Sequence, residues 1–397
     1  MKARRTYKYR IYPNREQRTC LEEWLETCRV LYNDCLTERR DAWSVAHKSI
    51  SYYAQANQLK EIKTFDENLK EVYAQVLQDV LKRIDKAFKN FFRQVKRREK
   101  AGYPRYKPRS RYSSFTYPQT GFKFSKDGKK LILSKIGSIN IKKHRGIPEL
   151  ANIKTCTIKK DLDRWYACFS VEIEVEEPDK DKGITNPIGI DLGITHLLTL
   201  SNGDTEDNPR YLSKSEKKLK RKQRRLSKSK KGSNNRSKRR FEVAKTYRKV
   251  REQRTDLLHK ISRSLVDTFD LIVFEDLKVK NMLKNHHLAK SISDVSWSQL
   301  TNFVSYKVEE TGGKVEFVDP KNTSQECSNC GKIVKKPLSQ RIHRCPFCGL
   351  VVDRDENAAI NILKKGLKNV GQELSELKPA EFSKRTMNQE ASSTRMG

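Results

Sequence analysis

Four cysteines near the end of the chain impose the strongest constraint on how it can fold. Cys327 and Cys330 form one C-x2-C pair, Cys345 and Cys348 form another, and 14 residues separate the pairs. Each pair predicts a turn that directs two thiolates to one point, with a following glycine that lets the backbone fold over the sulfurs. Four thiolates suit a tetrahedral Zn²⁺ ion, and a closed four-ligand site is structural rather than catalytic. A rubredoxin-like iron site is the alternative.

The remaining cysteines favour burial over disulfide bonding. The chain has nine cysteines, and its basic first ten residues lack the apolar region of a secretory signal. An odd number of cysteines without such a signal argues against a disulfide framework. The other five lie at apolar positions and are expected to be small buried hydrophobic residues. They are Cys20, Cys28, Cys35, Cys156 and Cys168.

The charge of the chain limits its partners. It has 84 Lys and Arg against 49 Asp and Glu, a net charge of +35. This excess opposes the compact state unless a polyanion neutralises it, and solubility alone needs a charge of only roughly 2–8 on a small domain. No apolar run approaches the roughly 20 residues that span a bilayer, and no lipidation motif is present. Nucleic acid is therefore the expected partner and the cytoplasm the expected location.

Hydrophobic spacing predicts a helical unit after an N-terminal strand. Residues 5–12 alternate as a strand does, and Asn14 with Gln17 forms a capping box for the first helix. Two long helices follow, and we interpret their apolar faces as core. The first face comprises Leu21, Trp24, Leu25, Cys28, Leu31, Tyr32 and Cys35. The second comprises Tyr73, Leu77, Val80, Ile84, Phe88, Phe91, Phe92 and Val95.

The pattern then changes to strands. Several short strands between residues 113 and 175, with a hairpin at Asp127-Gly128, indicate a small β-barrel that strand 5–12 can join. Residues 176–186 have the composition of a linker. From residue 187 the pattern is α/β, with strands at 188–192, 197–200, 271–275 and 315–318.

A basic helical pair, residues 213–229 and 236–268, lies inside this α/β region. Between Lys214 and Arg240 there are 15 Lys or Arg and one Glu. Such a run is usually a solvated face, but its helical flanks favour a surface that follows phosphates. The candidate nucleic-acid contacts are Lys220, Arg221, Arg224, Arg225, Arg236, Arg239 and Arg240.

Three carboxylates occupy positions that suit chemistry better than packing. Asp191 and Glu275 each end an apolar strand, where carboxylates commonly line a ligand crevice. Asp355 lies at the acidic start of a helix. Taken singly, Asp355 is better interpreted as a helix N-cap, and Asp191 can equally be a turn residue. Spacing alone does not bring the three together; if they converge, they can hold two Mg²⁺ ions roughly 4 Å apart and cleave a phosphodiester.

An ordered series of motifs along the chain resembles the TnpB family, the RNA-guided endonucleases of bacterial insertion sequences. The resemblance covers essentially the whole chain. The motifs are Tyr9-Arg10-Ile11-Tyr12-Pro13-Asn14, Gly189-Ile190-Asp191-Leu192-Gly193, Phe274-Glu275-Asp276-Leu277, Ser296-Trp297-Ser298, Ser324-Gln325-Glu326-Cys327-Ser328-Asn329-Cys330-Gly331 and Asp353-Arg354-Asp355-Glu356-Asn357-Ala358-Ala359-Ile360-Asn361-Ile362.

The resemblance implies a multidomain α+β protein with a RuvC-like, RNase H-fold nuclease domain. Residues 1–12 and 106–180 would form a wedge β-barrel, 13–105 a helical recognition domain, and 187–322 the nuclease domain with its basic helices. Residues 323–350 would be an inserted zinc ribbon that binds target nucleic acid, 351–366 the helix of the third nuclease motif, and 367–397 a disordered tail.

The resemblance also implies roles for particular residues. Asp191, Glu275 and Asp355 would be the catalytic ligands of two Mg²⁺ ions, with Asp355 preferred to Asp353 because it directly precedes the x-Asn-Ala-Ala stretch. The four cysteines would hold one structural Zn²⁺ ion, and Arg341 would contact nucleic acid.

The implied activity is cleavage of double-stranded DNA beside a transposon-adjacent motif, guided by one bound ωRNA, with the protein as a monomer. Base pairing would then supply the sequence specificity. Three alternatives stay open: a catalytically silent guided regulator, a transposase that acts without RNA, and a compact type V CRISPR effector.

Overall fold

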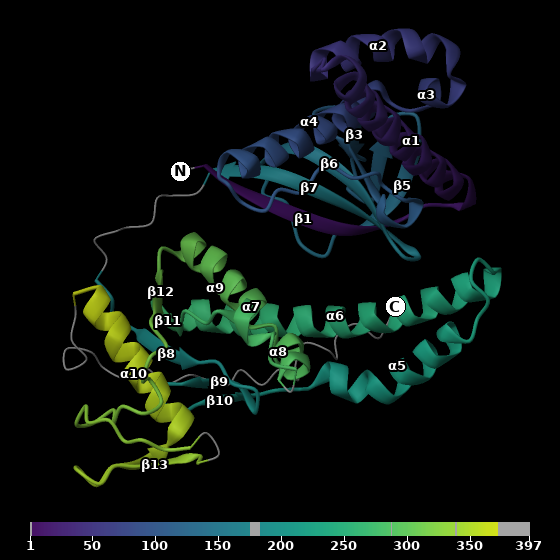
Figure 1. Cartoon of the computed structure of the whole chain (residues 1–397). Coiled ribbons are helices and arrows are strands. Elements are labelled where there is room, and N and C mark those ends of the chain that lie inside the picture. The colour runs from purple at the N-terminus through teal and green to yellow at the C-terminus, as the bar shows by residue number, and fades with distance from the viewer. Residues whose placement is uncertain (1, 175–182, 287, 338–339, 372–397) are drawn as a thin grey trace, which may run out of the picture. The chain divides into compact units, whose positions relative to one another are not determined.

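The computed structural model describes residues 2–174, 183–286, 288–337 and 340–371, so most of the predicted linker and tail lies outside the described residues. The chain divides into two compact units, Met1–Glu176 and Glu177–Gly397. Figure 1 shows the elements of both units.

A seven-stranded antiparallel sheet forms the centre of the first unit. Its order is β2-β6-β7-β1-β5-β4-β3, so the predicted N-terminal strand pairs with strands that follow the helices. Alternate residues of β7, from Trp165 to Val171, are buried, which gives the sheet one apolar face. Among the described residues β2 and β3 end the order, so closure into a barrel stays a prediction. The strands are β1 (Lys2–Tyr12), β2 (Ser114–Tyr117), β3 (Phe122–Phe124), β4 (Lys130–Leu133), β5 (Gly137–Lys142), β6 (Asn152–Asp161) and β7 (Arg164–Glu174).

The hairpin predicted at Asp127-Gly128 is confirmed and joins β3 to β4. Gly128 adopts a φ of +66°, a left-handed conformation that favours glycine. The Asp127 carboxylate accepts a hydrogen bond from the backbone N of Lys129 at 3.1 Å, which fixes the turn.

Four α-helices and a 3₁₀ turn complete the first unit. The predicted capping box of α1 is confirmed: Asn14 Oδ1 accepts from the N of Gln17 at 2.8 Å, and Gln17 Oε1 accepts from the N of Asn14 at 3.1 Å. All seven residues of its predicted apolar face are buried. The helices are α1 (Arg15–Ala46), α2 (Tyr52–Phe65), α3 (Glu67–Glu71) and α4 (Ala74–Lys96), with a 3₁₀ turn at Arg109–Arg111.

The predicted apolar face of α4 is only partly core. Leu77, Val80 and Ile84 are buried, but Phe92 is 60% exposed and Val95 is 50% exposed. The core prediction is therefore wrong for the last turns of the helix. The helical repeat continues there, but the buried residues of the helix end at Ile84, and the Phe91 ring instead contacts Phe92 and Tyr103.

The isolated cysteines behave largely as predicted. Cys28, Cys35 and Cys156 are buried, whereas Cys20 and Cys168 are half-buried. Burial raises the pKa of the Cys28 thiol to about 12, so this side chain is a neutral apolar group.

A mixed five-stranded sheet forms the centre of the second unit. Its order is β10-β9-β8-β11-β12, with β8, β11 and β12 parallel and β9 and β10 antiparallel to their neighbours. The four predicted strands are confirmed, and β10 is additional. The strands are β8 (Pro187–Asp191), β9 (His196–Leu200), β10 (Thr205–Asp207), β11 (Leu271–Glu275) and β12 (Lys314–Val318).

Helices cover both faces of this sheet. Alternate residues of β11 show the division: Ile272 and Phe274 share a core cluster with α6 and α9, whereas Leu271 and Val273 share one with α10. The predicted basic pair is confirmed as α5 and α6. The helices are α5 (Tyr211–Ser227), α6 (Asn234–Thr268), α7 (Val279–Met282), α8 (Ala289–Val295), α9 (Trp297–Thr311) and α10 (Arg354–Asn369).

Helix α10 lies directly on the sheet because two glycines leave room for it. A Cβ on Gly189 would lie 2.2 Å from the carbonyl oxygen of Ala359, and a Cβ on Gly366 would lie 2.4 Å from a methyl of Val273. The helix also continues past the boundary predicted from the sequence, since Leu367 is buried within it. The three residues before it form strand β14 (Val351–Asp353), which pairs with β13 (Ile342–Arg344), and not the start of the helix.

Of the helices in the described parts of the chain, none combines the length and the apolar character needed to cross a membrane.

Candidate active site and metal centre

Two of the predicted carboxylates end neighbouring parallel strands. In the register of β8 and β11, Ile190 lies opposite Phe274, so the next residues, Asp191 and Glu275, meet at the same edge of the sheet. Glu275 follows Val273 by two positions and therefore points to the face that α10 covers. Each acid is the last residue of a strand whose other residues are largely apolar and buried. Because those residues pack inside the sheet, the acid is left at its edge.

The third carboxylate is carried by the first turn of α10, where another residue provides the cap. Asp353 Oδ1 accepts hydrogen bonds from the backbone N of Asp355 at 2.7 Å and of Glu356 at 3.3 Å. The interpretation of Asp355 as the N-cap is therefore wrong. Its side chain is free of the helix terminus, is 9% exposed, and is available for a role at the edge of the sheet.

The electrostatics of Asp191 indicate that the other two carboxylates lie near it. Burial, together with the nearby negative charges of Glu275 and Asp355, raises the pKa of Asp191 to about 8. Burial also raises the pKa of Glu275, against the opposing effect of its hydrogen bond from Thr323. Neighbouring carboxylates whose pKa values are raised, as those of Asp191 and Glu275 are, are typical of a functional site.

Two guanidinium groups offset the negative charge of Asp355. Arg341 Nη1 lies 3.2 Å from Asp355 Oδ2, and Arg354 Nη2 lies 2.8 Å from Asp355 Oδ1. Arg341 Nη2 also donates to Thr195 Oγ1 at 3.0 Å. The structure thus places Arg341 beside the carboxylates, where it can also meet an anionic substrate.

The chemistry of the donor set, three carboxylates, is the kind that Mg²⁺ prefers. That ion prefers oxygen ligands in octahedral geometry and keeps several waters, so it is usually bound through one or two carboxylates and substrate phosphates. An open group of acids at the edge of a sheet suits this mode of binding better than a closed cage does.

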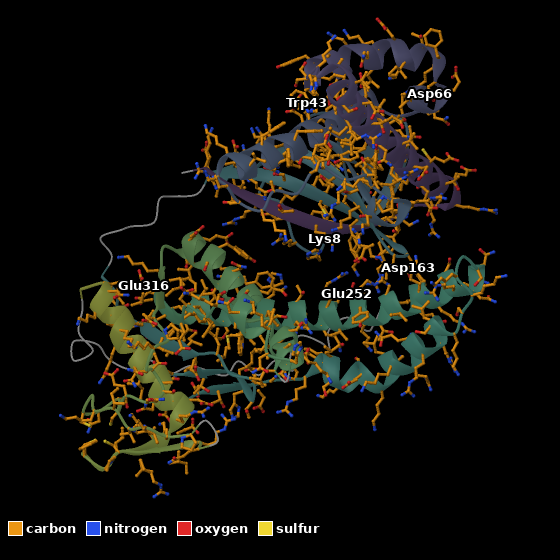
Figure 2. All side chains as sticks on the ribbon, viewed as in Figure 1. Lys8, Trp43, Asp66, Asp163, Glu252 and Glu316 are labelled. Atoms are coloured by element: carbon orange, nitrogen blue, oxygen red, sulfur yellow. The ribbon has the colours of Figure 1, made fainter. Side chains whose placement is uncertain are left out.

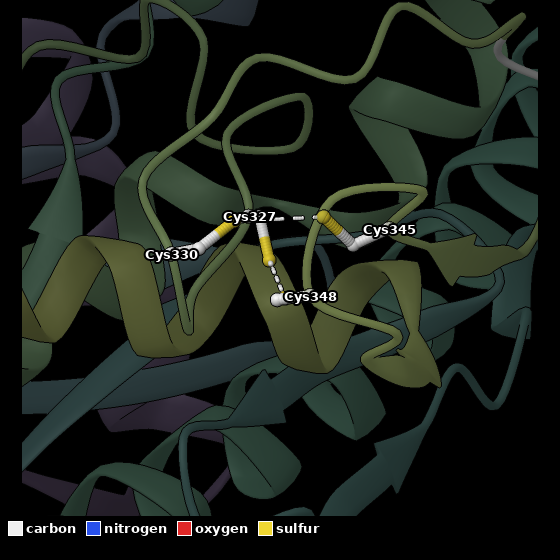
Figure 3. Close-up of side chains that lie close together, drawn as sticks. All are labelled: Cys327, Cys330, Cys345 and Cys348. Carbon is white, nitrogen blue, oxygen red and sulfur yellow. Dashed lines mark hydrogen bonds between the residues drawn. The ribbon is translucent and has the colours of Figure 1, made fainter.

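The four cysteines form a compact cluster (Figure 3). Cys327 Sγ lies 3.6 Å from Cys348 Sγ, and Cys330 Sγ lies 3.5 Å from Cys345 Sγ. All four sulfur atoms lie within 4.8 Å of one another. A tetrahedral ion with metal–sulfur bonds of about 2.3 Å needs sulfur atoms about 3.8 Å apart, so the cluster can hold a metal ion.

The backbone of each cysteine pair has the same geometry. The N of Gly331 donates to the carbonyl of Cys327 at 2.9 Å, and the N of Gly349 donates to the carbonyl of Cys345 at 3.0 Å. Both glycines have positive φ, 71° and 74°, as the sequence predicts. The backbone N–H of Leu350 lowers the pKa of the Cys348 thiol to about 6, which favours the thiolate that binds metal.

Basic side chains line the hairpin of α5 and α6, where Figure 2 shows nitrogen-tipped side chains along both helices. One groove is lined by basic side chains of α5 and of its C-cap. These are Lys217, Lys220, Arg221, Arg224, Arg225 and Lys228. Arg239 and Arg240 are exposed on α6.

Arg236 and Arg239 have structural contacts that the charge pattern did not indicate. Arg236 Nη1 donates to the carbonyls of Leu226 and Ser229 at 3.0 and 2.9 Å, and Arg239 Nη1 donates to the carbonyl of Arg225 at 2.8 Å. Both guanidinium groups satisfy carbonyls at the end of α5. As nucleic-acid contacts they stay predictions.

Sequence reasoning also missed a group of buried polar residues around the acids. They are Thr323, Asn357 and Asn361, which are 4%, 0% and 4% exposed. Asn357 and Asn361 are four residues apart on α10, a spacing that places them on one face. That spacing was a usable signal, but nothing in the sequence identified their partners.

Three family models match parts of the chain. A probable transposase model, named for OrfB of IS605, matches residues 170–286, a Cas12f1-like TNB domain matches 297–362, and a helix-turn-helix domain matches 1–48. Residues 2–46 contain one strand and one long helix in this chain.

Relatives match over nearly the full length. A protein of Streptomyces pristinaespiralis, named as an RNA-guided DNA endonuclease, is 36% identical over 371 residues, which cover 92% of this chain and 90% of the relative. The chain belongs to the TnpB family. InsQ of Escherichia coli K12, which carries the same description, is 32% identical over 384 residues, or 92% of this chain and 93% of InsQ.

A solved structure supports the fold expected of a TnpB protein. A Cas12f1 protein, determined with sgRNA and target DNA, superposes with a TM-score of 0.57 at 14% identity and covers 91% of this chain and 98% of its own. At that identity the similarity establishes the mixed α/β fold alone.

Proposed function

We propose that this chain is an RNA-guided endonuclease that hydrolyses DNA phosphodiester bonds at Asp191, Glu275 and Asp355. The observation that supports this most directly is that Asp191 and Glu275 end neighbouring strands and that Asp355 of α10 acts electrostatically on Asp191. Family membership supplies the class of reaction, and the retention of all three acids disfavours a catalytically silent regulator.

In this proposal the three carboxylates hold two divalent ions, with Mg²⁺ as the expected metal. Bound there, the ions would activate the attacking water and stabilise the leaving oxygen. The chain's own groups would set the conditions: Asp191 would have to give up its proton to serve as a ligand, and Arg341 lies beside Asp355, where it could orient a phosphate. Thr323 and the cap at Asp353 hold Glu275 and Asp355 in place.

In the same proposal the four cysteines and the basic groove of α5 have binding roles: the cysteines bind a structural metal ion and the groove binds nucleic acid. Four thiolates suit Zn²⁺, which would stabilise the segment between residues 323 and 350. The cationic groove of α5 fits a phosphate backbone, with an RNA guide and double-stranded DNA as the expected partners. The RuvC-like nuclease, wedge and recognition domains expected from the sequence belong to the same proposal.

The test begins with the nucleic acid that accompanies the protein. The gene is expressed with its downstream flank, and the RNA that copurifies is sequenced. One discrete structured RNA that extends past the coding sequence supports a guided enzyme and supplies the guide. A heterogeneous mixture of cellular RNA would favour a transposase that acts without a guide.

The cleavage assay then uses that RNA and a matching DNA duplex. Asp191→Ala should abolish cutting and leave RNA binding unchanged. Glu67→Ala serves as the control, because Glu67 is 79% exposed and makes only a surface pair with Lys70. Cutting by the Asp191→Ala protein at the parental rate would overturn the assignment of the active site.

A further inference from the structure

One hydroxyl group contacts a proposed metal ligand from outside the acidic cluster. Thr323 Oγ1 donates to Glu275 Oε1 at 2.5 Å and lies 3.0 Å from the carbonyl oxygen of Pro320. A hydroxyl has a single hydrogen, and the shorter distance directs it to the carboxylate. Because Thr323 is 4% exposed, no water can easily replace this donor.

The backbone of Thr323 is held in turn by α10. Asn361 Nδ2 donates to the carbonyl oxygen of Thr323 at 2.9 Å and to that of Glu326 at 2.7 Å. Asn361 is itself 4% exposed, so both donor hydrogens of its amide are used in the interior. The backbone at Thr323, and with it the residue that carries the hydroxyl, is thus held by the helix that carries Asp355.

The same helix is hydrogen-bonded to the backbone on both sides of Cys327. Asn357 Nδ2 donates to the carbonyl oxygen of Glu326 at 2.7 Å, and Asn357 Oδ1 accepts from the backbone N of Ser328 at 2.9 Å. Lys364 adds a contact to the carbonyl oxygen of Ser328. Glu326 and Ser328 flank Cys327, so α10 holds the first cysteine pair and Thr323 as one segment.

We propose that Thr323 is a positioning residue for Glu275, and that Asn361 couples it to the four-cysteine cluster. The inference rests on the proposed function, because it assumes that Glu275 binds a divalent ion. An outer hydrogen bond to a carboxylate ligand fixes its orientation, and removing such a partner typically weakens metal binding by about 10- to 100-fold. The four-cysteine cluster and the acids would then be coupled through α10, so that disturbing one site would change metal binding at the other.

The test uses Mn²⁺ as an oxygen-preferring stand-in for Mg²⁺ and measures its binding by electron paramagnetic resonance. The full chain is purified with its RNA, and zinc content is measured in parallel. Thr323→Val removes the hydroxyl and keeps the shape of the side chain. It should bind Mn²⁺ about 10- to 100-fold more weakly with zinc content unchanged. Thr323→Ser retains the hydroxyl and should stay within about threefold of the parent.

Equal Mn²⁺ affinity in the Thr323→Val and parent proteins would overturn the inference and leave Thr323 a purely structural residue. If Thr323→Val fails to fold or loses zinc, Thr323→Ala is judged by the same criterion. For the coupling, Asn361→Leu and Thr323→Val are combined: if Asn361 acts through Thr323, the double variant should bind Mn²⁺ no more weakly than the weaker single variant. Additive losses would overturn the coupling.

Failure of this inference is distinguishable from failure of the proposed function. Asp191→Asn should abolish the high-affinity Mn²⁺ site if the carboxylates bind metal at all. Loss of the site in Asp191→Asn together with parental binding in Thr323→Val would reject only the role of Thr323. Parental Mn²⁺ binding in Asp191→Asn would reject the carboxylate site itself.

Discussion

The carboxylate of Asp353 accepts a hydrogen bond from the backbone N of Asp355 at 2.7 Å, so two acids that are neighbours in the sequence have different tasks. Asp353 caps the N-terminus of α10, whereas the Asp355 carboxylate pairs with Arg341 and Arg354 and lies near Asp191. This division of labour can be tested by conservative substitution at each position.

Asp353→Asn should preserve the helix, because Asn caps as well as Asp does, and cleavage should stay within about tenfold of the parent. Asp355→Asn should lower the cleavage rate by about a thousandfold or more, since it removes a proposed ligand, while the melting temperature stays near that of the parent. Rate measurements and calorimetry on both proteins decide the matter. A reversed pattern, with Asp353→Asn inactive and Asp355→Asn active, would reassign the ligand.

The pKa of Asp191 predicts how stability depends on pH. In the folded protein it is about 8, against about 3.9 for a free Asp, so between these values the folded state holds a proton that the unfolded state has released. The contribution to stability is present at low pH and is lost as pH rises through about 8. Without added Mg²⁺, the melting temperature should fall as pH rises from about 5 to about 8 and level off above that, and Asp191→Asn should flatten this fall. Parallel curves for the two proteins would contradict the assignment.

Cys327→Ser should remove the metal ion of the cysteine cluster. The sulfur of Cys327 is one of four within 4.8 Å, and a hydroxyl is a much poorer ligand than a thiolate. We expect zinc content, measured by mass spectrometry, to fall from about one ion per chain to near zero, with a lower melting temperature. Cys20→Ser is the control, because Cys20 lies outside the cluster. Equal zinc in parent and Cys327→Ser would refute the site.

If the groove of α5 binds phosphates, its basic residues should contribute to the salt dependence of nucleic-acid binding. We replace Lys220, Arg221 and Arg224 together by Gln and measure the nucleic-acid binding constant at several salt concentrations. The magnitude of the slope of its logarithm against log salt should fall by about two to three, since each phosphate contact contributes about 0.7–0.9. A matched control replaces Lys60, Lys126 and Lys130, which are exposed and outside the hairpin. If both triple variants change the slope equally, the groove is only part of a diffuse charge.

Gly189→Ala should disturb the packing of α10 against the sheet. The added Cβ would lie 2.2 Å from the carbonyl oxygen of Ala359. Both atoms belong to backbone elements, so the clash can be relieved only if α10 moves away from β8. We expect a loss of stability of about 1–3 kcal/mol or more and weaker cleavage, because Asp355 moves with the helix. Gly146→Ala is the control, since nothing lies within 4 Å of its added methyl group. Parental stability and activity in Gly189→Ala would show that the contact is easily relieved.

Local signals in the sequence predicted the elements well. The capping box at Asn14, the buried face of α1 and the turn at Gly128 all depend on neighbours within a few residues. Strand ends were equally visible, since Asp191 and Glu275 interrupt apolar runs. The four-cysteine cluster followed from spacing alone because its ligands come in two short pairs.

Features set by distant partners could not be predicted. Phe92 continues the repeat of α4, but its exposure depends on where the packing layer ends. The choice of Asp353 as the cap depends on the strand that precedes α10. The contact between Thr323 and Glu275 joins residues 48 positions apart, which only the folded chain brings together.

The order of the acids along the chain has a consequence for synthesis. Asp191 and Glu275 leave the ribosome first, and α10 with Asp355 follows 80 residues after Glu275. At about 5–20 residues per second, this interval lasts about 4–16 s. The basic hairpin of α5 and α6 lies before Glu275 and α10 in the chain, so a nascent chain can present this basic surface to nucleic acid before it has all three acids.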